Sequence, residues 1–266
     1  MTDRAFISFV MPAFNCATTV RVSIASIMNG NFEPGDELII VNDASTDSTQ
    51  QVIDEQREKY EGIVVRQHLI NKGSAAAGRN TAIERARNEL IFCLDADNVL
   101  VPNSVPKLKA HLLRTGADAA AFGELHYFVD DPQEVTHKWV YKEGIITLSD
   151  ALSGSIWPGP SGNYMLTKES WLRAGRYNEF IGGAYDSWAF GIQQLATGSK
   201  MVTLKETFYY HRYGHASVFV RDSQKTNASL TALCVLLPFL CLINDVDVEY
   251  VMSQEGRYTG KTLVWV

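Results

Sequence analysis

Short apolar runs alternate with amphipathic stretches through the first 115 residues of the chain. Four of the runs favour β-strands, at residues 6–11, 37–41, 63–67 and 90–94. Four intervening stretches have the spacing of helices, around residues 19–28, 48–61, 73–88 and 103–115. Strands that alternate with helices of this length predict βαβ units. We therefore expect an α/β fold with a mostly parallel sheet flanked by helices.

The alternation weakens after residue 116. The patterns there predict strands at 117–129, 200–204 and 208–212 and short helices at 168–174 and 186–196. A charged and aromatic stretch at 130–144 and a loop rich in Gly, Pro and Ser at 153–163 lie between them. From about residue 224 the chain is apolar and predicted to be helical. The expected organisation is one catalytic domain over 1–220 and a helical extension over 221–266, packed on or beside it.

Loop segments follow the four strands predicted first, and they include two acidic clusters and one basic loop. They lie at 11–15, 42–47, 71–80 and 95–98. Because ligands of parallel sheets bind at the carboxyl ends of the strands, we expect these segments to meet at one edge. Asp95 and Asp97 flank Ala96 directly after an apolar strand, and two such carboxylates can hold a hard cation such as Mg²⁺ or Mn²⁺. A solvated turn or a helix cap is the alternative for this short motif taken alone.

These segments together resemble the motifs of the family 2 glycosyltransferases, which have the GT-A fold. The family's PTYN, DDGSTD, Gly-rich ARN and DADD segments are similar to PAFN at 12–15, NDASTD at 42–47, GSAAAGRN at 73–80 and DADN at 95–98. The match covers roughly residues 5–105 and continues more weakly to about residue 217. This chain departs from the pattern at Ala13, Asn42 and Ala44, which alters the loops expected to bind the nucleotide.

The resemblance implies a nucleotide-sugar donor, with a UDP-sugar favoured. It places the donor-binding residues at Pro12, Ala13, Phe14, Asp43, Arg79, Asp95 and Ala96. Asp43 would accept a hydrogen bond from the N3–H of uracil, and Phe14 would lie against the base. Arg79 would help to hold the nucleotide end, and Asp95 would contact the ribose or the metal. The alternatives are a turn residue for Asp43 and a surface salt bridge for Arg79.

The same resemblance assigns the metal and the catalytic base. Asp97 would ligate the Mn²⁺ or Mg²⁺ that bridges the diphosphate, with His211 as a second candidate ligand and His215 as an alternative to it. Asp186, at the start of a predicted helix, would remove the proton from the acceptor hydroxyl, and the anomeric configuration would be inverted. Tyr185 stands where the family commonly has Glu. A helix cap is the alternative role for Asp186.

Composition limits the partners and the compartment. The net charge of −6 over 266 residues argues against a nucleic-acid partner. The four cysteines are scattered, which favours reduced thiols in the cytoplasm. The most apolar run, at 230–243, is too short to span a bilayer. We expect a cytoplasmic protein, with peripheral association at the inner face of the membrane or self-association through the C-terminal helix as further options.

The function predicted from the sequence is transfer of a sugar from a UDP-sugar to a hydroxyl acceptor, which could be a glycan, lipid-linked or of another kind. Synthesis of a polysaccharide or a cell-surface glycan would be its setting. A sugar-phosphate nucleotidyltransferase would need a Gly-rich, basic loop after the first strand, where this chain has MPAFN at 11–15. A non-catalytic nucleotide- or carbohydrate-binding module derived from such a transferase is the remaining alternative, and retention of Asp95, Asp97 and Asp186 argues against it.

Overall fold

The computed structural model describes residues 5–152, 162–181, 185–214, 234–235 and 237–238. Within these residues, ten strands form one sheet in the order β3-β2-β1-β4-β9-β6-β10-β5, with β7 beside β6 and β8 beside β10. The first five strands are β1 (Ile7–Ala13), β2 (Glu37–Asn42), β3 (Ile63–Gln67), β4 (Leu90–Cys93) and β5 (Val99–Leu100). The others are β6 (Ala119–Phe128), β7 (His137–Val140), β8 (Gly144–Ile146), β9 (Met165–Thr167) and β10 (Met201–Arg212).

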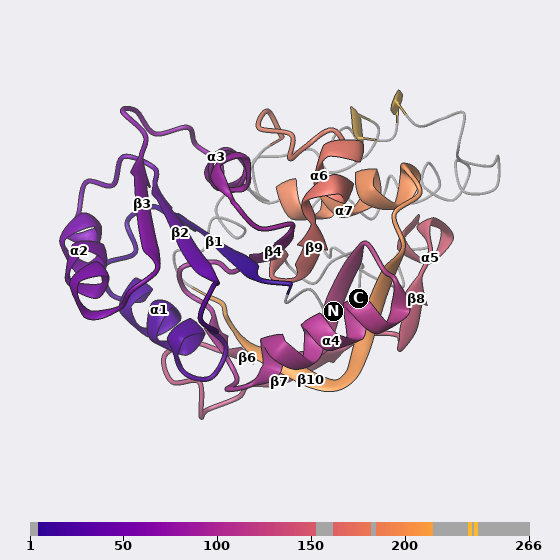
Figure 1. Ribbon diagram of the computed structural model, residues 1–266, viewed down its shortest axis with the longest axis horizontal. Helices are drawn as coiled ribbons and strands as arrows, with labels where there is room; N and C mark the ends of the chain where they lie inside the picture. The colour runs from indigo at the N-terminus through magenta and orange to yellow at the C-terminus, as the bar shows by residue number, and fades with distance from the viewer. Residues whose placement is uncertain (1–4, 153–161, 182–184, 215–233, 236, 239–266) are drawn as a thin grey trace.

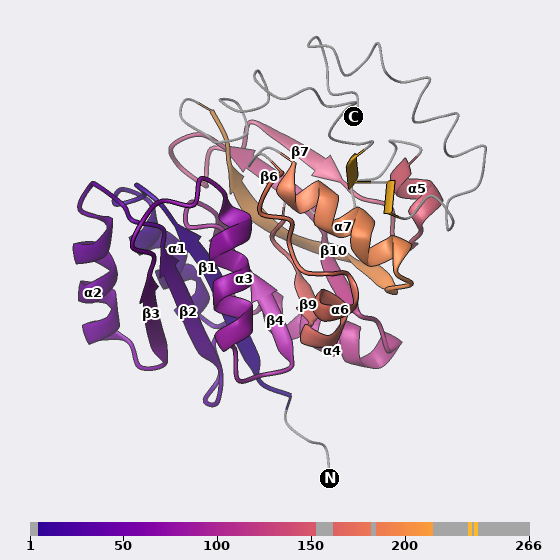
Figure 2. The same cartoon turned by 90° about the horizontal axis from the view of Figure 1, so that it is seen from above.

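Helices cover both faces of this sheet (Figure 1). One face carries α1 (Val20–Met28) and α4 (Ser104–Thr115). The other carries α3 (Ala75–Arg85), α6 (Lys168–Arg173) and α7 (Asp186–Ala196), as the view from above shows (Figure 2). Beside α1 lies α2 (Thr49–Lys59), and the short α5 (Leu148–Leu152) follows β8. The expected α/β class, a central sheet flanked by helices, is confirmed.

The strands that the second half adds change the character of the sheet. Pairing is parallel through β3, β2, β1 and β4 and again between β6 and β10. The ladders made by β5, β7, β8 and β9 are antiparallel. The sheet is thus parallel where the sequence shows βαβ units and mixed beyond them. The predicted extension over 221–266 lies almost wholly outside the described residues.

One prediction in the second half was wrong in its boundaries. The strands expected at 200–204 and 208–212 are a single strand, β10, whose register with β6 shifts between Leu204 and Phe208. Glu206 has a positive φ of 60° at this irregularity. The polar residues of the bulge interrupt the apolar pattern without ending the strand. The two-residue β5 and the three-residue β8 and β9 were not predicted, because segments so short show no periodicity.

A row of aromatic rings crosses the middle of the sheet. Phe9 contacts Phe92 with ring centroids 5.6 Å apart, and Phe92 contacts Phe122 at 6.0 Å. Phe122 in turn contacts Tyr209 at 5.5 Å. These four fully buried side chains come from β1, β4, β6 and β10. The large apolar area buried by these four side chains ties the parallel half of the sheet to the mixed half, across β9, which lies between β4 and β6.

Helix α3 lies unusually close to the end of β1. A Cβ atom on Gly78 would come within 2.9 Å of the Cβ of Pro12, so only glycine lets the helix approach this strand so closely. Ser74 begins the helix, and its side chain accepts a hydrogen bond from the N–H of Ala76. The close approach places Arg79, the next residue, over the carboxyl ends of the parallel strands.

Candidate active site

The loops after β1 and β2 are joined to one another. The N–H of Asp43 donates to the carbonyl of Ala13 at 2.8 Å. The side chain of Asn15 accepts from the N–H of Thr46 at 2.8 Å, and the N–H of Asn15 donates to Ser45 Oγ at 3.0 Å. The two motifs that the sequence places after separate strands therefore form one surface, as parallel pairing of β1 with β2 requires.

Phe14 is the exposed aromatic residue of this surface. Pro12 and Ala13 close β1, where Ala13 is buried and Pro12 packs beneath Gly78. The side chain of Phe14 is 42% exposed directly after them. A large ring left in solvent at the carboxyl edge of a parallel sheet is available for stacking on a flat ligand. This geometry suits the predicted role of Phe14 beside a nucleobase, which stays a prediction.

Asp43 is held by groups on three sides. Its carboxylate accepts from His68 Nδ1 at 2.6 Å, and both of its oxygens accept from the N–H of Lys72 at 3.0 Å. The side chain of Asn71 donates to the Asp43 carbonyl at 3.1 Å. His68 was missed at the sequence level, although it directly follows β3 at the same edge of the sheet. That position was the signal that could have identified it.

Arg79 connects two of the predicted site residues. Its Nη1 donates to Asp186 Oδ2 at 3.0 Å, and its Nη2 donates to Asp95 Oδ1 at 2.5 Å. The guanidinium is almost fully buried and lies over the ring of Tyr177, 5.4 Å from its centroid. Asp95 follows β4, and Asp186 is the first residue of α7. A surface salt bridge, the alternative considered for Arg79, does not fit this environment.

Burial and charge set the protonation of this triad. Burial alone would lower the pKa of Arg79, but the carboxylates of Asp95 and Asp186 outweigh it and keep the guanidinium charged. Burial raises the pKa of Asp186 above its ordinary range, while Arg79 opposes that rise. The N–H of Ser187 donates to Asp186 Oδ1 at 2.7 Å. Asp186 is therefore a carboxylate of raised basicity at a helix N-terminus.

A second set of hydrogen bonds leads from Asp95 to His211. Asn163 pairs with Asp95 reciprocally: the Asp95 N–H donates to Asn163 Oδ1 at 2.7 Å, and Asn163 Nδ2 donates to Asp95 Oδ2 at 3.0 Å. Asn163 Nδ2 also lies 3.3 Å from the hydroxyl of Tyr209, which contacts His211 Nδ1 at 3.2 Å. Burial lowers the pKa of His211 to about 4, so the imidazole is neutral at pH 7. Asn163 and Tyr209 were not identified from the sequence as members of this network.

Asp97 differs from Asp95 in having no salt bridge or side-chain hydrogen bond to any described residue. Burial first, and the neighbouring Asp95 carboxylate second, raise the pKa of Asp97 to about 7. Arg212 and Arg79 oppose this rise without cancelling it, so a cation bound beside the two carboxylates would further stabilise the charged form of Asp97. In the described part of the chain no three His, Cys, Asp or Glu side chains form a preassembled metal cluster. The donor set therefore fits Mg²⁺ or Mn²⁺ held by one or two carboxylates together with substrate phosphates.

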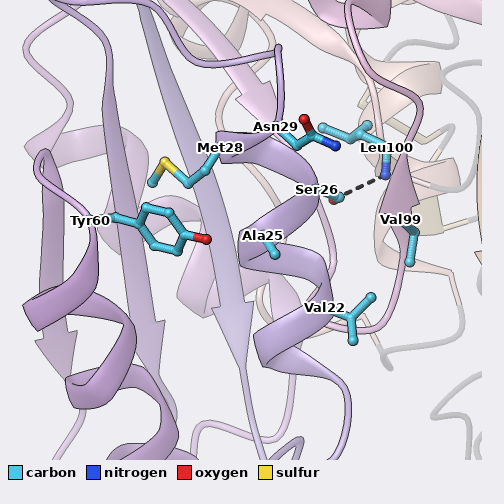
Figure 3. Close-up of a pocket in the computed structure, with 8 residues that line it drawn as sticks. All are labelled: Val22, Ala25, Ser26, Met28, Asn29, Tyr60, Val99 and Leu100. Carbon is cyan, nitrogen blue, oxygen red and sulfur yellow. Dashed lines mark hydrogen bonds between the residues drawn. The ribbon is translucent and has the colours of Figure 1, made fainter.

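A separate hollow of about 520 Å³ lies against α1 (Figure 3). It is lined by Val22, Ala25, Ser26, Met28, Asn29, Tyr60, Val99 and Leu100. Ser26 Oγ accepts from the N–H of Leu100 at 3.0 Å at its rim, which fastens β5 to the helix. No charged side chain and no predicted site residue lines this hollow, and α1 covers the face of the sheet opposite α3. The candidate site is therefore the triad of Arg79, Asp95 and Asp186 with the loops around it.

The family profile of "Glycosyl transferase family 2" matches residues 8–175, which include the strand-end loops and Asp95, Ala96 and Asp97. The chain belongs to this family. The resemblance deduced from the sequence motifs is confirmed, and the match extends well beyond the first hundred residues. Asp186 and His211 lie after the matched segment, so this match does not bear on their predicted roles, which stay predictions.

Curated relatives within the family come from several bacteria. The chain is 35% identical over 95 residues to a poly(ribitol-phosphate) beta-glucosyltransferase of Bacillus spizizenii, covering 35% of this chain and 15% of the relative. It is 30% identical over 154 residues to the poly(ribitol-phosphate) beta-N-acetylglucosaminyltransferase TarP of Staphylococcus aureus, covering 56% and 45%. It is 25% identical over 263 residues to the GalNAc(5)-diNAcBac-PP-undecaprenol beta-1,3-glucosyltransferase of Campylobacter jejuni, covering 95% and 77%. The matches thus span less than half the length of the first two relatives.

Solved structures of the S. aureus family member TarS share the fold. Residues 1–349 of TarS in complex with UDP superpose with a TM-score of 0.65 at 18% identity, covering 85% of this chain and 65% of that one. The complex with UDP-GlcNAc gives a TM-score of 0.67 at 15% identity, covering 95% and 80%. At these identities the likeness concerns the fold. Among the described residues, no helix is long and apolar enough to cross a bilayer.

Proposed function

We propose that this chain transfers a sugar from a UDP-sugar to a hydroxyl group, with inversion at the anomeric carbon and with Mn²⁺ or Mg²⁺ on the diphosphate. The observation that carries this proposal is the shared guanidinium of Arg79. It brings Asp186, the candidate base, next to Asp95, a residue of the predicted donor motif. A base for the acceptor and a site for the donor must adjoin for an in-line transfer.

In the reaction, the acceptor oxygen forms a bond to the anomeric carbon as the bond to the UDP oxygen breaks. Asp186 takes the proton of the attacking hydroxyl, and its raised pKa makes it a stronger base than an ordinary carboxylate. UDP departs with the electron pair of the broken bond. Attack opposite to the leaving group inverts the anomeric configuration, and Arg79 keeps Asp186 oriented toward the site.

Asp97 and His211 are the residues that would hold the cation. Asp97 provides the unpaired carboxylate, and His211 is neutral and able to ligate. A divalent cation there would stabilise the negative charge that develops on the departing diphosphate. Asp95 is occupied by Arg79 and Asn163, so we assign it to positioning the ribose side of the donor and the loop that carries Asp97.

Relatives support the choice of substrates. TarS binds UDP and UDP-GlcNAc, and the named relatives are glucosyl- and N-acetylglucosaminyltransferases. Their acceptors are poly(ribitol-phosphate) and, in C. jejuni, an undecaprenol-linked oligosaccharide. These names favour a UDP-hexose donor and an acceptor in cell-surface glycan synthesis. An acceptor linked to a lipid would bring the protein to the cytoplasmic face of the membrane, where the predicted peripheral association would operate.

The test is release of nucleoside diphosphate from a panel of UDP- and GDP-sugars, with Mn²⁺, with Mg²⁺ or with EDTA. Wild-type protein should hydrolyse one UDP-sugar slowly when a cation is present. The D97A variant should lose this activity because it lacks a ligand of the cation. The D186N variant should still bind UDP but should not transfer the sugar to an added acceptor. Glu58, an exposed carboxylate on α2, provides the control variant E58Q.

Two results would count against the proposal. Metal-dependent UDP binding without turnover from any donor or acceptor would favour the alternative of a binding module. Absence of UDP binding by calorimetry, with and without Mn²⁺, would remove the donor site itself.

A further inference from the structure

His68 lies at the contact between the loop after β3 and the carboxylate of Asp43. Its Nδ1 is 2.6 Å from Asp43 Oδ1, and its Nε2 is 3.0 Å from the hydroxyl of Thr81 on α3. Both side chains of the pair are largely covered, with His68 12% and Asp43 8% exposed. The imidazole thus bridges an acidic residue after β2 and the helix that also carries Arg79.

The contact fixes which atoms donate. A carboxylate only accepts hydrogen bonds, so Nδ1 must carry a proton and donate to Asp43. The Thr81 hydroxyl engages the other ring nitrogen and prevents the ring from rotating away. The backbone N–H of Lys72 reaches both carboxylate oxygens from another direction. Two donors from the loop after β3, the ring of His68 and the N–H of Lys72, therefore determine where the Asp43 oxygens point.

One of these oxygens keeps the capacity to bind a ligand. Oδ1 accepts from both His68 and Lys72, whereas Oδ2 accepts only from Lys72 among the described residues. A carboxylate oxygen has two lone pairs, so Oδ2 can accept a further hydrogen bond. Phe14 is exposed in the adjoining loop after β1, where a base could lie against it.

We infer that His68 is a positioning residue for the nucleobase: by donating to Oδ1 it orients Asp43 so that Oδ2 accepts the N3–H of a uracil ring. The inference rests on the proposed UDP-sugar function. It also predicts that the site prefers uracil to cytosine. Cytosine has no hydrogen on N3 and presents an acceptor to the same carboxylate. An acceptor facing an oriented carboxylate is left unpaired, which disfavours binding.

The test measures UDP and CDP affinity by calorimetry for wild-type protein, four variants at the site and one control variant. In H68N the side-chain nitrogen can replace Nδ1, whereas in H68Q it lies near the position of Nε2. We expect H68A and H68Q to lose about tenfold in UDP affinity, because a hydrogen bond to a charged group is lost. H68N should stay within about threefold of wild type, and T81V should lose less than H68A. His111, on α4 across the sheet, provides the control H111A.

Selectivity separates positioning from a general effect on folding. In H68A and H68Q the ratio of UDP to CDP affinity should fall, while a merely destabilised site would weaken both nucleotides equally. Wild-type UDP affinity and selectivity retained in H68A, H68Q and T81V would overturn the inference and leave the proposed function intact. Failure of the wild-type protein to bind UDP would overturn both.

Discussion

Arg79 donates to the carboxylate of Asp186 across 3.0 Å, although 107 positions separate the two residues in the chain. The same guanidinium holds Asp95, so one buried cation balances the buried carboxylate of Asp186 and the partly buried carboxylate of Asp95. This arrangement joins the first half of the fold, where the nucleotide motifs lie, to the helix that carries the candidate base. Its energetic and catalytic consequences can be tested separately.

Removal of the Arg79 charge should destabilise the fold strongly. R79M leaves the buried Asp186 and the partly buried Asp95 without a counter-ion, and we expect a loss of about 3–5 kcal/mol in the free energy of unfolding. The double variant R79M/D186N should recover part of that loss, since it removes one unpaired charge. Urea denaturation measures both effects.

The matched control is R21M, which breaks an ion pair between Arg21 and Glu55, both about half exposed. It should cost far less than R79M, because an ion pair exposed to solvent contributes little to stability. Equal losses in R79M and R21M would contradict the central role given to the buried triad.

Asp97 should destabilise the metal-free protein as the pH rises. Its pKa of about 7 in the folded state is above that of an ordinary Asp, so the unfolded chain loses its proton first. Folding stability due to this group is highest below about pH 4 and is lost as the pH rises to about 7. D97N should therefore unfold at a higher temperature than wild type at pH 8, with a smaller difference at pH 5.

When Mn²⁺ and UDP are added at pH 8, wild-type protein should unfold at a higher temperature than D97N. The reason is that wild-type protein can bind the cation, whereas D97N binds it poorly. The control E58Q should show neither the pH-dependent difference nor the change with metal. If D97N and wild type unfold at the same temperature in metal-free buffer at both pH values, the pKa of Asp97 is not raised in the folded protein.

Gly162 should prove essential to the geometry of Arg79. A Cβ atom there would lie 2.5 Å from Ser187 Oγ and 3.0 Å from Arg79 Nη2. G162A should therefore reduce nucleotide-sugar turnover at least tenfold by displacing the guanidinium from Asp95 and Asp186. G198A is the control, because Gly198 has a similar φ of +83° but no neighbour within 4 Å. Equal turnover in G162A and G198A would contradict the prediction. It would show that contact with Arg79 adds nothing to the backbone strain that both substitutions introduce.

Most of the first half of the fold could be predicted from the sequence because β1, β2 and β4 are buried on both faces and are therefore continuous apolar runs. The strand at Ile63–Gln67 and the helix at Asp186–Ala196 have the bounds that their apolar patterns indicate. The same reasoning placed Asp43 and Asp95 at one edge of the sheet, since parallel strands bring their carboxyl ends together. To bring these two residues together, the prediction needs only the order in which the strands pair. The βαβ connections restrict that order.

The partners of these residues could not be predicted. Asn163 reaches Asp95 from 68 positions away, and His68 reaches Asp43 across two strand-end loops. Such contacts depend on side-chain directions in the folded chain, which no local periodicity encodes. For the same reason the two carboxylate partners of the Arg79 Nη atoms could not be predicted, and the role of Arg79 at the nucleotide end stays a prediction.

Cysteine reactivity should follow burial. Burial raises the pKa of Cys16 to about 12 and that of Cys93 to about 11, so both are almost entirely thiols at pH 8. Cys234 is exposed, and all three are unpaired. Iodoacetamide at pH 8 should label Cys234 well before the other two, as peptide mass spectrometry can measure. Unfolding in urea is the control and should equalise the rates, whereas rapid labelling of Cys93 in the native protein would contradict its burial in the core.

Ala44 should be a strained residue that glycine relieves. It stands where the family commonly has Gly, and its φ of 56° lies in the left-handed region that disfavours residues with a Cβ atom. We expect A44G to raise the free energy of unfolding by up to about 1 kcal/mol, because the strain relieved exceeds the entropy that glycine adds to the unfolded chain. The control A25G, inside α1, should lower it by about 1 kcal/mol. If both variants lose stability in urea denaturation, the loop after β2 accommodates Ala44 without strain, and its departure from the family pattern has no energetic cost.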